Sequence, residues 1–183
     1  MIIFLVLLGI VLLLVVWVIS LYNNLVKLRN RIENAWAQID VQLKRRWDLI
    51  PNLVETVKGY ADHERETLEA VIEARNAATS ASGPQESAAN ENILSGALRQ
   101  LFAVSEAYPD LKANQNFLEL QEELTGTEGR IAYARQYYND QVLKYNTAIE
   151  TFPAVVIAGA LRFTEREYFE ADDESRGTVS VEF

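Results

Sequence analysis

The feature that most constrains this chain is a long apolar run at its N-terminus. Residues 1–18 carry no charged side chain, and apolar residues continue almost without a break to Tyr22. About 20 such residues are what an α-helix needs to cross the hydrocarbon core of a bilayer. A cleavable signal peptide would show a basic start, a shorter apolar stretch and a small-residue cleavage site, which this segment lacks. We therefore predict one transmembrane helix over residues 1–22.

Basic residues follow the apolar run directly, although the whole chain has a formal charge of -9. Loops rich in Lys and Arg beside a span stay on the cytoplasmic side of the membrane. We expect a single-pass protein of the cell membrane, with the N-terminus outside and the soluble domain in the cytoplasm. Lys27, Arg29 and Arg31 are the candidate contacts for lipid headgroups, because they lie nearest to the span.

A second basic cluster, Lys44, Arg45 and Arg46, lies further along the chain. It is about 33 Å past the span if the helix is straight, and charges at that distance from the membrane surface are largely screened. We expect these side chains to form ion pairs with Asp40, Asp48 and acidic residues on neighbouring helices.

Beyond the span, the apolar residues recur at alternating intervals of three and four. They fall at positions 25, 28, 32, 35, 39, 43, 46/47, 50, 54, 57 and 61. This spacing predicts a helix with an inward-facing seam, as in a coiled coil. We assign the seam position 46/47 to Trp47. Because Trp36 lies beside the seam, the apolar stripe is broad enough for a bundle.

Pro51 interrupts this pattern, because proline has no N–H and its ring clashes with the carbonyl four residues earlier. The sequence predicts helices over residues 23–49 and 51–78, and a single long helix continuing through Pro51 is the alternative. Residues 79–86 have the composition of a loop. Two more helices are expected, one from about Ser87 to Tyr108 and a longer one from Phe117 to Phe152, both with apolar residues at helical spacing.

No segment before the tail alternates as a strand does, so the predicted class is all-α. The expected architecture is the transmembrane helix followed by an antiparallel, up-and-down four-helix bundle with long helices. The bundle domain covers residues 23–169, and residues 170–183 form an acidic tail that we expect to be flexible. Gly126 and Gly129 lie inside the last long helix, where they indicate close packing against another helix or a weak point.

After Pro153 the chain has a short segment that is entirely apolar or glycine, residues 154–161. It is too short to span a membrane, and it can pack on its own domain, touch the bilayer surface or contact another subunit. Together with the two tryptophans it forms the candidate interaction surface. That surface consists of Trp36, Trp47, Val155, Val156, Ile157, Leu161 and Phe163.

The sequence gives no support for catalysis. It has no Cys and a single His, His63, which excludes thiolate chemistry and sites that need two imidazoles from one chain. The glutamates of the last long helix are best assigned to its solvated face, and Tyr133, Tyr137, Tyr138 and Tyr145 to the core or an interface. We predict no catalytic, cofactor-binding or metal-binding residue, and the acidic charge argues against nucleic acid as a partner.

Several stretches of the chain resemble the LemA family. They are NLVKLRN at 24–30, AWAQIDVQLKRR at 35–46, DLIPNLVETVKGY at 48–60, YPDLKAN at 108–114, FLELQEEL at 117–124, YNT at 145–147 and FP at 152–153. The resemblance implies a bacterial or archaeal membrane protein with an N-terminal span and a helical bundle. It implies no established enzyme activity, and it provides no catalytic or cofactor residue to assign to these positions.

The leading functional hypothesis is a membrane-anchored structural or scaffold protein that self-associates at the bilayer. The alternative is an adaptor or regulatory partner of another membrane protein, such as a protease or an envelope factor. The predicted partners are therefore the lipid bilayer, further copies of the chain and, under the alternative, another membrane protein.

Overall fold

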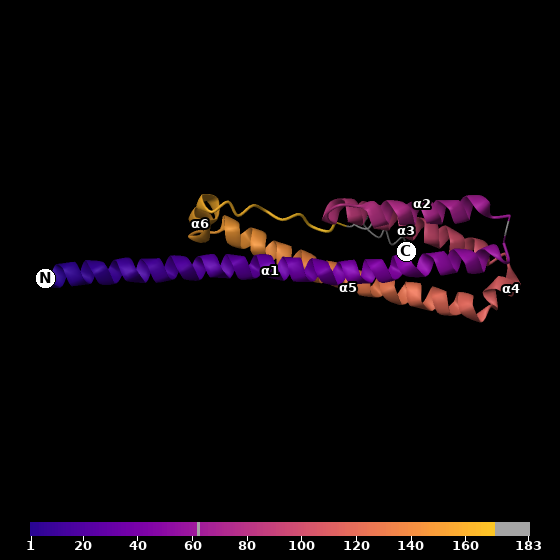
Figure 1. Cartoon of the computed structure of the whole chain (residues 1–183), viewed down its shortest axis with the longest axis horizontal. Helices are drawn as coiled ribbons and strands as arrows, with labels where there is room; N and C mark the ends of the chain where they lie inside the picture. The colour runs from indigo at the N-terminus through magenta and orange to yellow at the C-terminus, as the bar shows by residue number, and fades with distance from the viewer. Residues whose placement is uncertain (62, 171–183) are drawn as a thin grey trace, which may run out of the picture. The chain divides into compact units, whose positions relative to one another are not determined.

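The computed structural model describes residues 1–61 and 63–170, and every regular element in these ranges is an α-helix (Figure 1). This confirms the all-α class with a long N-terminal apolar helix. The elements are α1 (Ile2–Lys58), α2 (Arg65–Ser80), α3 (Pro84–Ser105), α4 (Pro109–Lys112), α5 (Gln115–Glu150) and α6 (Ala154–Ala160). The predicted acidic tail lies, apart from Glu170, outside the described residues.

Helix α1 continues through Pro51, as the alternative prediction allowed. Pro51 cannot donate to the carbonyl of Trp47, four residues earlier, so that carbonyl needs another partner. Arg75 of α2 supplies it, because its Nε donates a hydrogen bond to the Trp47 oxygen at 3.3 Å. A side chain from the neighbouring helix therefore satisfies the backbone group that proline leaves open.

The predicted helix over residues 51–78 is wrong, because α1 ends at Lys58 and α2 begins at Arg65. The amides of Tyr60 and Ala61 both bond to the carbonyl of Val57, which closes the end of α1 in a tight turn. Ala61, Leu68 and Val71 are all buried, so the apolar spacing hardly changes across the reversal. Periodicity alone could not detect this break.

The chain divides into two compact units, and α1 and α5 each contribute to both. The first unit comprises Met1–Ala37 and Gln136–Glu167. The second comprises Gln38–Arg135 and the described residues after 167. The interval predicted as one bundle domain, residues 23–169, therefore includes parts of both units.

In the second unit, four long helices contribute to one hydrophobic core. Figure 1 shows that successive helices run in alternating directions: α2 returns along the C-terminal part of α1, α3 runs back beside α2, and α5 returns again after the short α4. The core cluster takes Leu53 and Val57 from α1, Val71 from α2, Leu94 and Leu101 from α3, Leu111 from α4 and Phe117 from α5.

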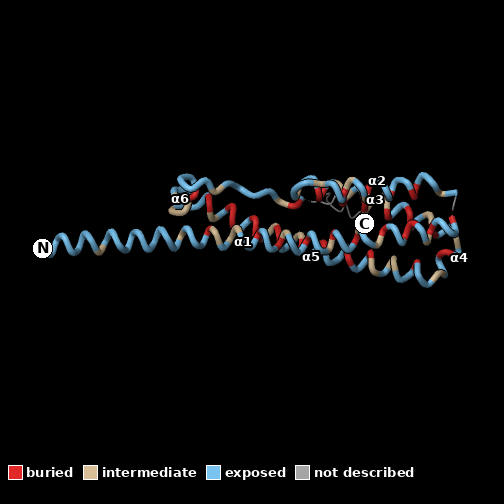
Figure 2. Tube along the Cα trace, viewed as in Figure 1, coloured by how far each residue is buried: buried red, intermediate tan, exposed pale blue. Residues whose placement is uncertain are grey.

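In the first unit, only α1 and α5 run side by side, and the chain after α5 folds back along them (Figure 2). Most apolar residues at the predicted seam positions of both helices are buried, including Leu25, Ile32, Val142 and Ile149, and Leu28 is half-buried. Phe152, which we predicted as the last seam residue of the fourth helix, is instead 79% exposed. Helix α5 has already ended at Glu150, so Phe152 is no longer in helical phase.

The two glycines inside α5 do not mark a close approach within this chain. Among the described residues, a Cβ atom at Gly129 would meet no atom within 4 Å, and one at Gly126 would meet only the end of the Arg130 side chain, at 3.9 Å. Close packing between described helices of the chain, one of the two explanations that the sequence offered, is therefore wrong, and these positions are exposed on α5 in the second unit.

Candidate functional site

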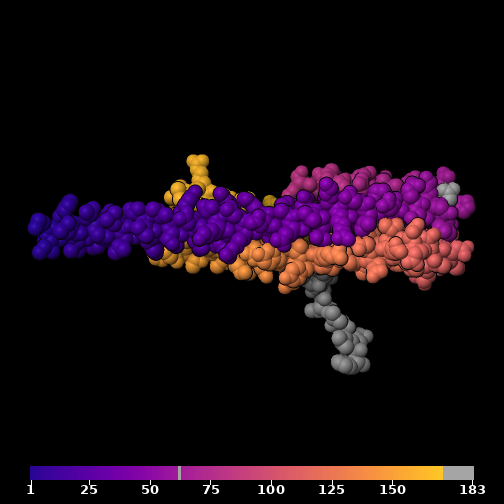
Figure 3. All heavy atoms as spheres, turned by 60° about the horizontal axis from the view of Figure 1, so that its bottom comes forward, coloured from indigo at the N-terminus to yellow at the C-terminus, as the bar shows by residue number. Residues whose placement is uncertain are grey.

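The N-terminal part of α1 is bare apolar surface. Nearly all side chains from Ile2 to Ser20 are exposed, and the most hydrophobic stretch of this helix has none of its residues buried (Figure 3). At 1.5 Å per residue, residues 2–20 measure about 28 Å, close to the roughly 30 Å hydrocarbon thickness of a bilayer. Length and composition make this segment a candidate membrane span.

The three basic residues after the span have different surroundings. Lys27 and Arg31 are exposed, whereas Arg29 is half-buried. The Arg29 guanidinium lies over the ring of Phe163, 5.9 Å from its centroid, and its Nε is buried without a hydrogen-bond partner. Contact of these residues with headgroups stays a prediction, and Lys27 and Arg31 are the two whose side chains are open to solvent.

A segment that we call the strap, residues 163–167, runs back along α5 in the first unit, and polar side chains of α5 hold its backbone. Asn146 makes two bonds to Arg166: its amide nitrogen donates to the Arg166 carbonyl at 3.0 Å, and its oxygen accepts from the Arg166 amide at 2.9 Å. The hydroxyls of Tyr145 and Tyr138 donate to the carbonyls of Thr164 and Glu167, at 3.0 and 2.9 Å.

The two tyrosine hydroxyls remain protonated donors at physiological pH. Burial raises the pKa of Tyr138 to about 12, with a smaller opposing effect from Arg166, and burial also raises the pKa of Tyr145. The ring of Tyr138 packs edge-on against Trp36, with centroids 5.6 Å apart. Trp36, a predicted interaction residue, is thus half-buried within the first unit.

Helix α6 and its flanks carry the other members of the predicted interaction surface. Val155, Val156 and Leu161 are exposed, Ile157 is half-buried, and Ala158 is buried. Phe163 packs edge-on against Tyr22 of α1, with ring centroids 5.9 Å apart. The apolar segment is therefore fixed to α1 through Phe163, while three of its large side chains face outward.

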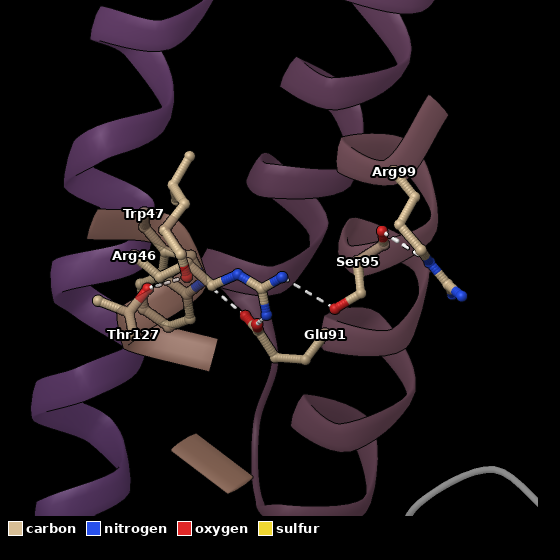
Figure 4. Close-up of polar contacts among 7 residues, drawn as sticks. Arg46, Trp47, Glu91, Ser95, Arg99 and Thr127 are labelled. Atoms are coloured by element: carbon tan, nitrogen blue, oxygen red, sulfur yellow. Dashed lines mark hydrogen bonds and ion pairs between the residues drawn. The ribbon is translucent and has the colours of Figure 1, made fainter. Parts of the chain in front are cut away.

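The second unit holds a buried ion pair between α1 and α3 (Figure 4). Arg46 and Glu91 are 4% and 5% exposed, and their Nη1 and Oε2 atoms are 3.0 Å apart. The other carboxylate oxygen accepts a 2.6 Å bond from the Trp47 indole, and the second guanidinium nitrogen of Arg46 donates to the Ser95 hydroxyl at 2.9 Å. One carboxylate thus receives bonds from two successive residues of α1.

This arrangement corrects the assignment of the seam position 46/47 to Trp47. Arg46 is the more buried of the two residues, because Glu91 neutralises its charge inside the core. Burial raises the pKa of the Glu91 carboxyl above its ordinary value of 4.5, and the nearby Arg46 charge and the bonds from Trp47 and Arg46 oppose that rise. Arg45, also from the basic cluster, pairs with Glu123 of α5 at 2.8 Å on the surface. The prediction of ion pairs with acids on neighbouring helices is confirmed for these two arginines.

A cavity of about 130 Å³ adjoins the buried pair. Its walls contain two arginines and two glutamates, so their charges balance. The lining residues are Arg46, Glu91, Asn92, Ser95, Glu128, Ile131, Ala132, Arg135 and Phe169. The charged and amide side chains of this lining make the cavity polar. Within residues 1–61 and 63–170, no three His, Asp or Glu side chains gather as a metal site.

Glu91 and Asn146 were not among the predicted functional residues, although a signal for Glu91 was present in the sequence. Glu91 lies three and seven residues before Leu94 and Leu98, on the inward stripe of α3, and Arg46 lies on the seam of α1. Opposite charges at two inward positions predict a buried pair, because an unpaired charge would be too costly there. Asn146 follows the seam residue Tyr145, but nothing in its spacing predicts that it binds backbone.

The sequence was compared with known protein families and with characterised proteins. A family model described as the LemA family matches residues 35–183. The chain belongs to the LemA family. It is 29% identical over 163 residues to protein LemA of Metamycoplasma hominis, covering 87% of this chain and 73% of the relative. It is also 26% identical over 174 residues to magnetosome protein MamQ of Magnetospirillum gryphiswaldense, covering 81% of this chain. The chain spans 64% of the length of MamQ, less than two thirds. We conclude that it is a membrane-associated helical protein.

Proposed function

We propose that this LemA family protein is a membrane-anchored scaffold that self-associates in the bilayer and has no catalytic activity. Its apolar span holds the chain in the membrane, and its helical part presents surfaces to further copies. Support for anchoring comes from the bare apolar surface of residues 2–20, which would expose large aliphatic side chains to water without a bilayer.

The observation that carries self-association is an open stripe on α5 in the second unit. Gly126, Gly129 and Tyr133 lie at intervals of three and four, so they share one face of the helix. Tyr133 is 76% exposed, and both glycines are exposed with no neighbour that a Cβ would displace. Each glycine costs about 1 kcal/mol of helix stability relative to alanine, and no close contact with the described part of the chain offsets that cost.

A helix from a second copy would account for this stripe. Glycines allow two helix backbones to approach closely, and an adjacent tyrosine supplies a large amphipathic ring of the kind enriched at interface hot spots. The two tryptophans of the predicted interaction surface, by contrast, are half-buried within their own units. We therefore propose the stripe formed by Gly126, Gly129 and Tyr133 as the face between copies.

Disulfide crosslinking in native membranes tests this face directly, because the chain contains no Cys and every introduced thiol is the only one. Gly129→Cys should give a crosslinked dimer on mild oxidation. Ile93→Cys is the matched control, since Ile93 is also an exposed helical position but lies on α3. Equal crosslinking of both variants, or none at Gly129→Cys, would reject the stripe as the interface.

A second test uses steric bulk. Gly126→Leu with Gly129→Leu should reduce the mass of the detergent-extracted assembly measured by light scattering, while the melting temperature of the chain stays the same or rises. Gly96→Leu should leave the mass unchanged. A monomer in both the wild-type and the variant chains would exclude self-association and favour the adaptor role instead.

We also propose that the soluble part lies in the cytoplasm, on the basis of the Lys and Arg residues after the span. In intact cells, a membrane-impermeant maleimide should not label Gly96→Cys, but it should do so once the cells are opened. Labelling of intact cells would reverse the orientation without affecting the proposed interface.

A further inference from the structure

We propose that α6 is a second membrane contact, which lies in the headgroup layer of the same bilayer that α1 crosses. This inference rests on the proposed anchoring by α1. In this proposal lipid covers the exposed apolar residues of α6, and no second protein is needed to cover them.

Helix α6 and the N-terminal part of α1, up to Ala37, both belong to the first unit, so the level of α6 along the span can be given. Residues 2–20 fill the hydrocarbon core, and Tyr22 lies two residues beyond, about 3 Å along the helix axis. Phe163 packs against the Tyr22 ring at 5.9 Å. The interface between hydrocarbon and headgroups is where such aromatic residues concentrate. The Tyr22–Phe163 pair therefore places the start of the strap at that interface.

A short connection joins Phe163 to the end of α6. The Phe163 amide donates to the carbonyl of Ala158 at 3.0 Å, across a turn in which Arg162 has a φ of 57°. This turn fixes α6 directly beside Phe163. Figure 1 shows α6 beside α1 at the point where the uncovered N-terminal part of α1 begins.

Helix α6 and its flanks carry exposed apolar side chains. Phe152, Val155, Val156 and Leu161 are exposed, with Val156 at 65%. All four lie within ten residues of chain. Phe163, two residues after Leu161, contacts Tyr22 at the end of the span. The exposed Arg162 can keep its charge among lipid phosphates while its stem stays in the apolar layer. A short apolar helix with a flanking cation suits the interfacial zone of a bilayer.

The strap maintains this contact. Asn146, Tyr145 and Tyr138 hold the strap backbone along α5, so the chain between α5 and the strap is tied at both ends. Helix α6 is thus presented beside the span in a fixed position, instead of on a free tail. The α1 span and α6 would together give the first unit two points of attachment to one membrane.

Site-specific fluorescence in vesicles of phosphatidylcholine and phosphatidylglycerol tests the proposal on the full chain. A polarity-sensitive fluorophore on Val156→Cys should emit at shorter wavelength than on Ile93→Cys, and nitroxide lipids with a shallow label should quench it. Ile93 is the matched control, because it is a similarly exposed aliphatic residue, at 59%, on α3. A fluorophore on Val11→Cys, in the middle of the span, shows whether the span lies in the hydrocarbon core.

The outcomes separate this inference from the proposed function. Quenching at Val156→Cys together with deep quenching at Val11→Cys supports α6 as a membrane contact. A lipid signal at Val11→Cys with a water-like signal at Val156→Cys overturns the inference and leaves the anchor intact. A water-like signal at Val11→Cys rejects the anchor as well. Oxidative dimer formation by Val156→Cys without lipid quenching would mean that a second copy covers α6, which also overturns the inference.

A charged substitution at an exposed position of α6 tests the membrane contact without unfolding the chain. Because Val155 is exposed, Val155→Asp should leave the helical circular dichroism unchanged. It should shift the emission of a fluorophore on Leu161→Cys toward that of Ile93→Cys, since a carboxylate is unfavourable in the apolar layer. An unchanged Leu161→Cys signal in this background would count against α6 as a lipid contact.

Discussion

The two units stabilise their polar groups in opposite ways. The second unit pairs side chain with side chain inside a four-helix core, where Arg46 and Glu91 neutralise each other. The first unit has only two long helices, and side chains of α5 bind the backbone of the strap, which has no helical bonds of its own. Where helices surround a core, a buried charge can be matched across it. Where an extended segment covers the core, its backbone N–H and C=O groups must find hydrogen-bond partners instead.

The largest loss in the free energy of unfolding should come from breaking the buried ion pair of the second unit. Glu91→Ala leaves the Arg46 guanidinium buried and unpaired, so we expect the free energy of unfolding to fall by about 3–5 kcal/mol. Denaturant unfolding of the full chain in detergent measures this loss. The double variant Arg46→Met with Glu91→Leu should recover most of the stability, because well-packed apolar residues can replace a buried pair. A loss below about 1 kcal/mol in Glu91→Ala would mean that water reaches the pair.

The corresponding break in the first unit is Asn146→Ala, which removes both bonds to Arg166. We expect a loss of about 1–3 kcal/mol, since each bond contributes about 0.5–1.5 kcal/mol. Hydrogen exchange at the Arg166 amide should accelerate more than exchange in α2. Asn146→Asp keeps the acceptor for that amide, so it should lose less than the alanine variant. Equal acceleration throughout the chain would show that the strap does not open separately.

The strap should also respond to alkaline pH. Burial raises the pKa of Tyr138 to about 12 in the folded state, above the ordinary value of 10. The folded state therefore keeps its proton over a range in which the unfolded state has lost it, and stability falls as pH rises from 10 through about 12. Tyr138→Phe should cost about 0.5–1.5 kcal/mol at neutral pH and reduce this alkaline loss. The same pH dependence in wild type and variant would assign it to other groups.

The smallest effect should come from the exposed pair of Arg45 and Glu123 in the second unit. These side chains are 51% and 43% exposed, so solvent screens their attraction strongly. Glu123→Gln should change the free energy of unfolding by less than about 1 kcal/mol, and added salt should remove what remains. A loss approaching that of Glu91→Ala would contradict the idea that burial sets the strength of the ion pairs in this unit.

Apolar spacing predicted most of the helical structure. The positions from Leu25 to Ala61 that we assigned to one seam are nearly all buried or half-buried, because a sustained spacing of three and four is typical of a helix that buries one face. The reversal after Lys58 was missed, since the spacing continues across it. The Trp47 carbonyl that Pro51 leaves without a helical donor accepts a hydrogen bond from Arg75, a residue of another helix, and the sequence of α1 alone does not contain that information.

The buried ion pair and the polar bonds to the strap were harder to predict than the apolar seam. Hydrophobicity assigns position 46/47 to the more apolar side chain, whereas the fold buries Arg46, because Glu91 is available on α3. The bonds from Asn146 to the strap join residues 20 apart whose side-chain chemistry gives no pairing signal. The basic residues after the span were predicted as a group, but Arg29 differs from its neighbours because Phe163 returns to cover it.

The bonds that hold the strap also determine how this region can change during evolution. The groups of residues 164, 166 and 167 that bind α5 belong to the main chain, and the side chains from 164 to 167 are all exposed. The Arg166 side chain makes a long, exposed ion pair with Glu33, at 3.8 Å, so other residues with an amide hydrogen can replace it at small cost. Deleting one residue would instead move every carbonyl of the strap away from its partner on α5. Related chains should therefore vary in the amino acids of the strap but keep its length.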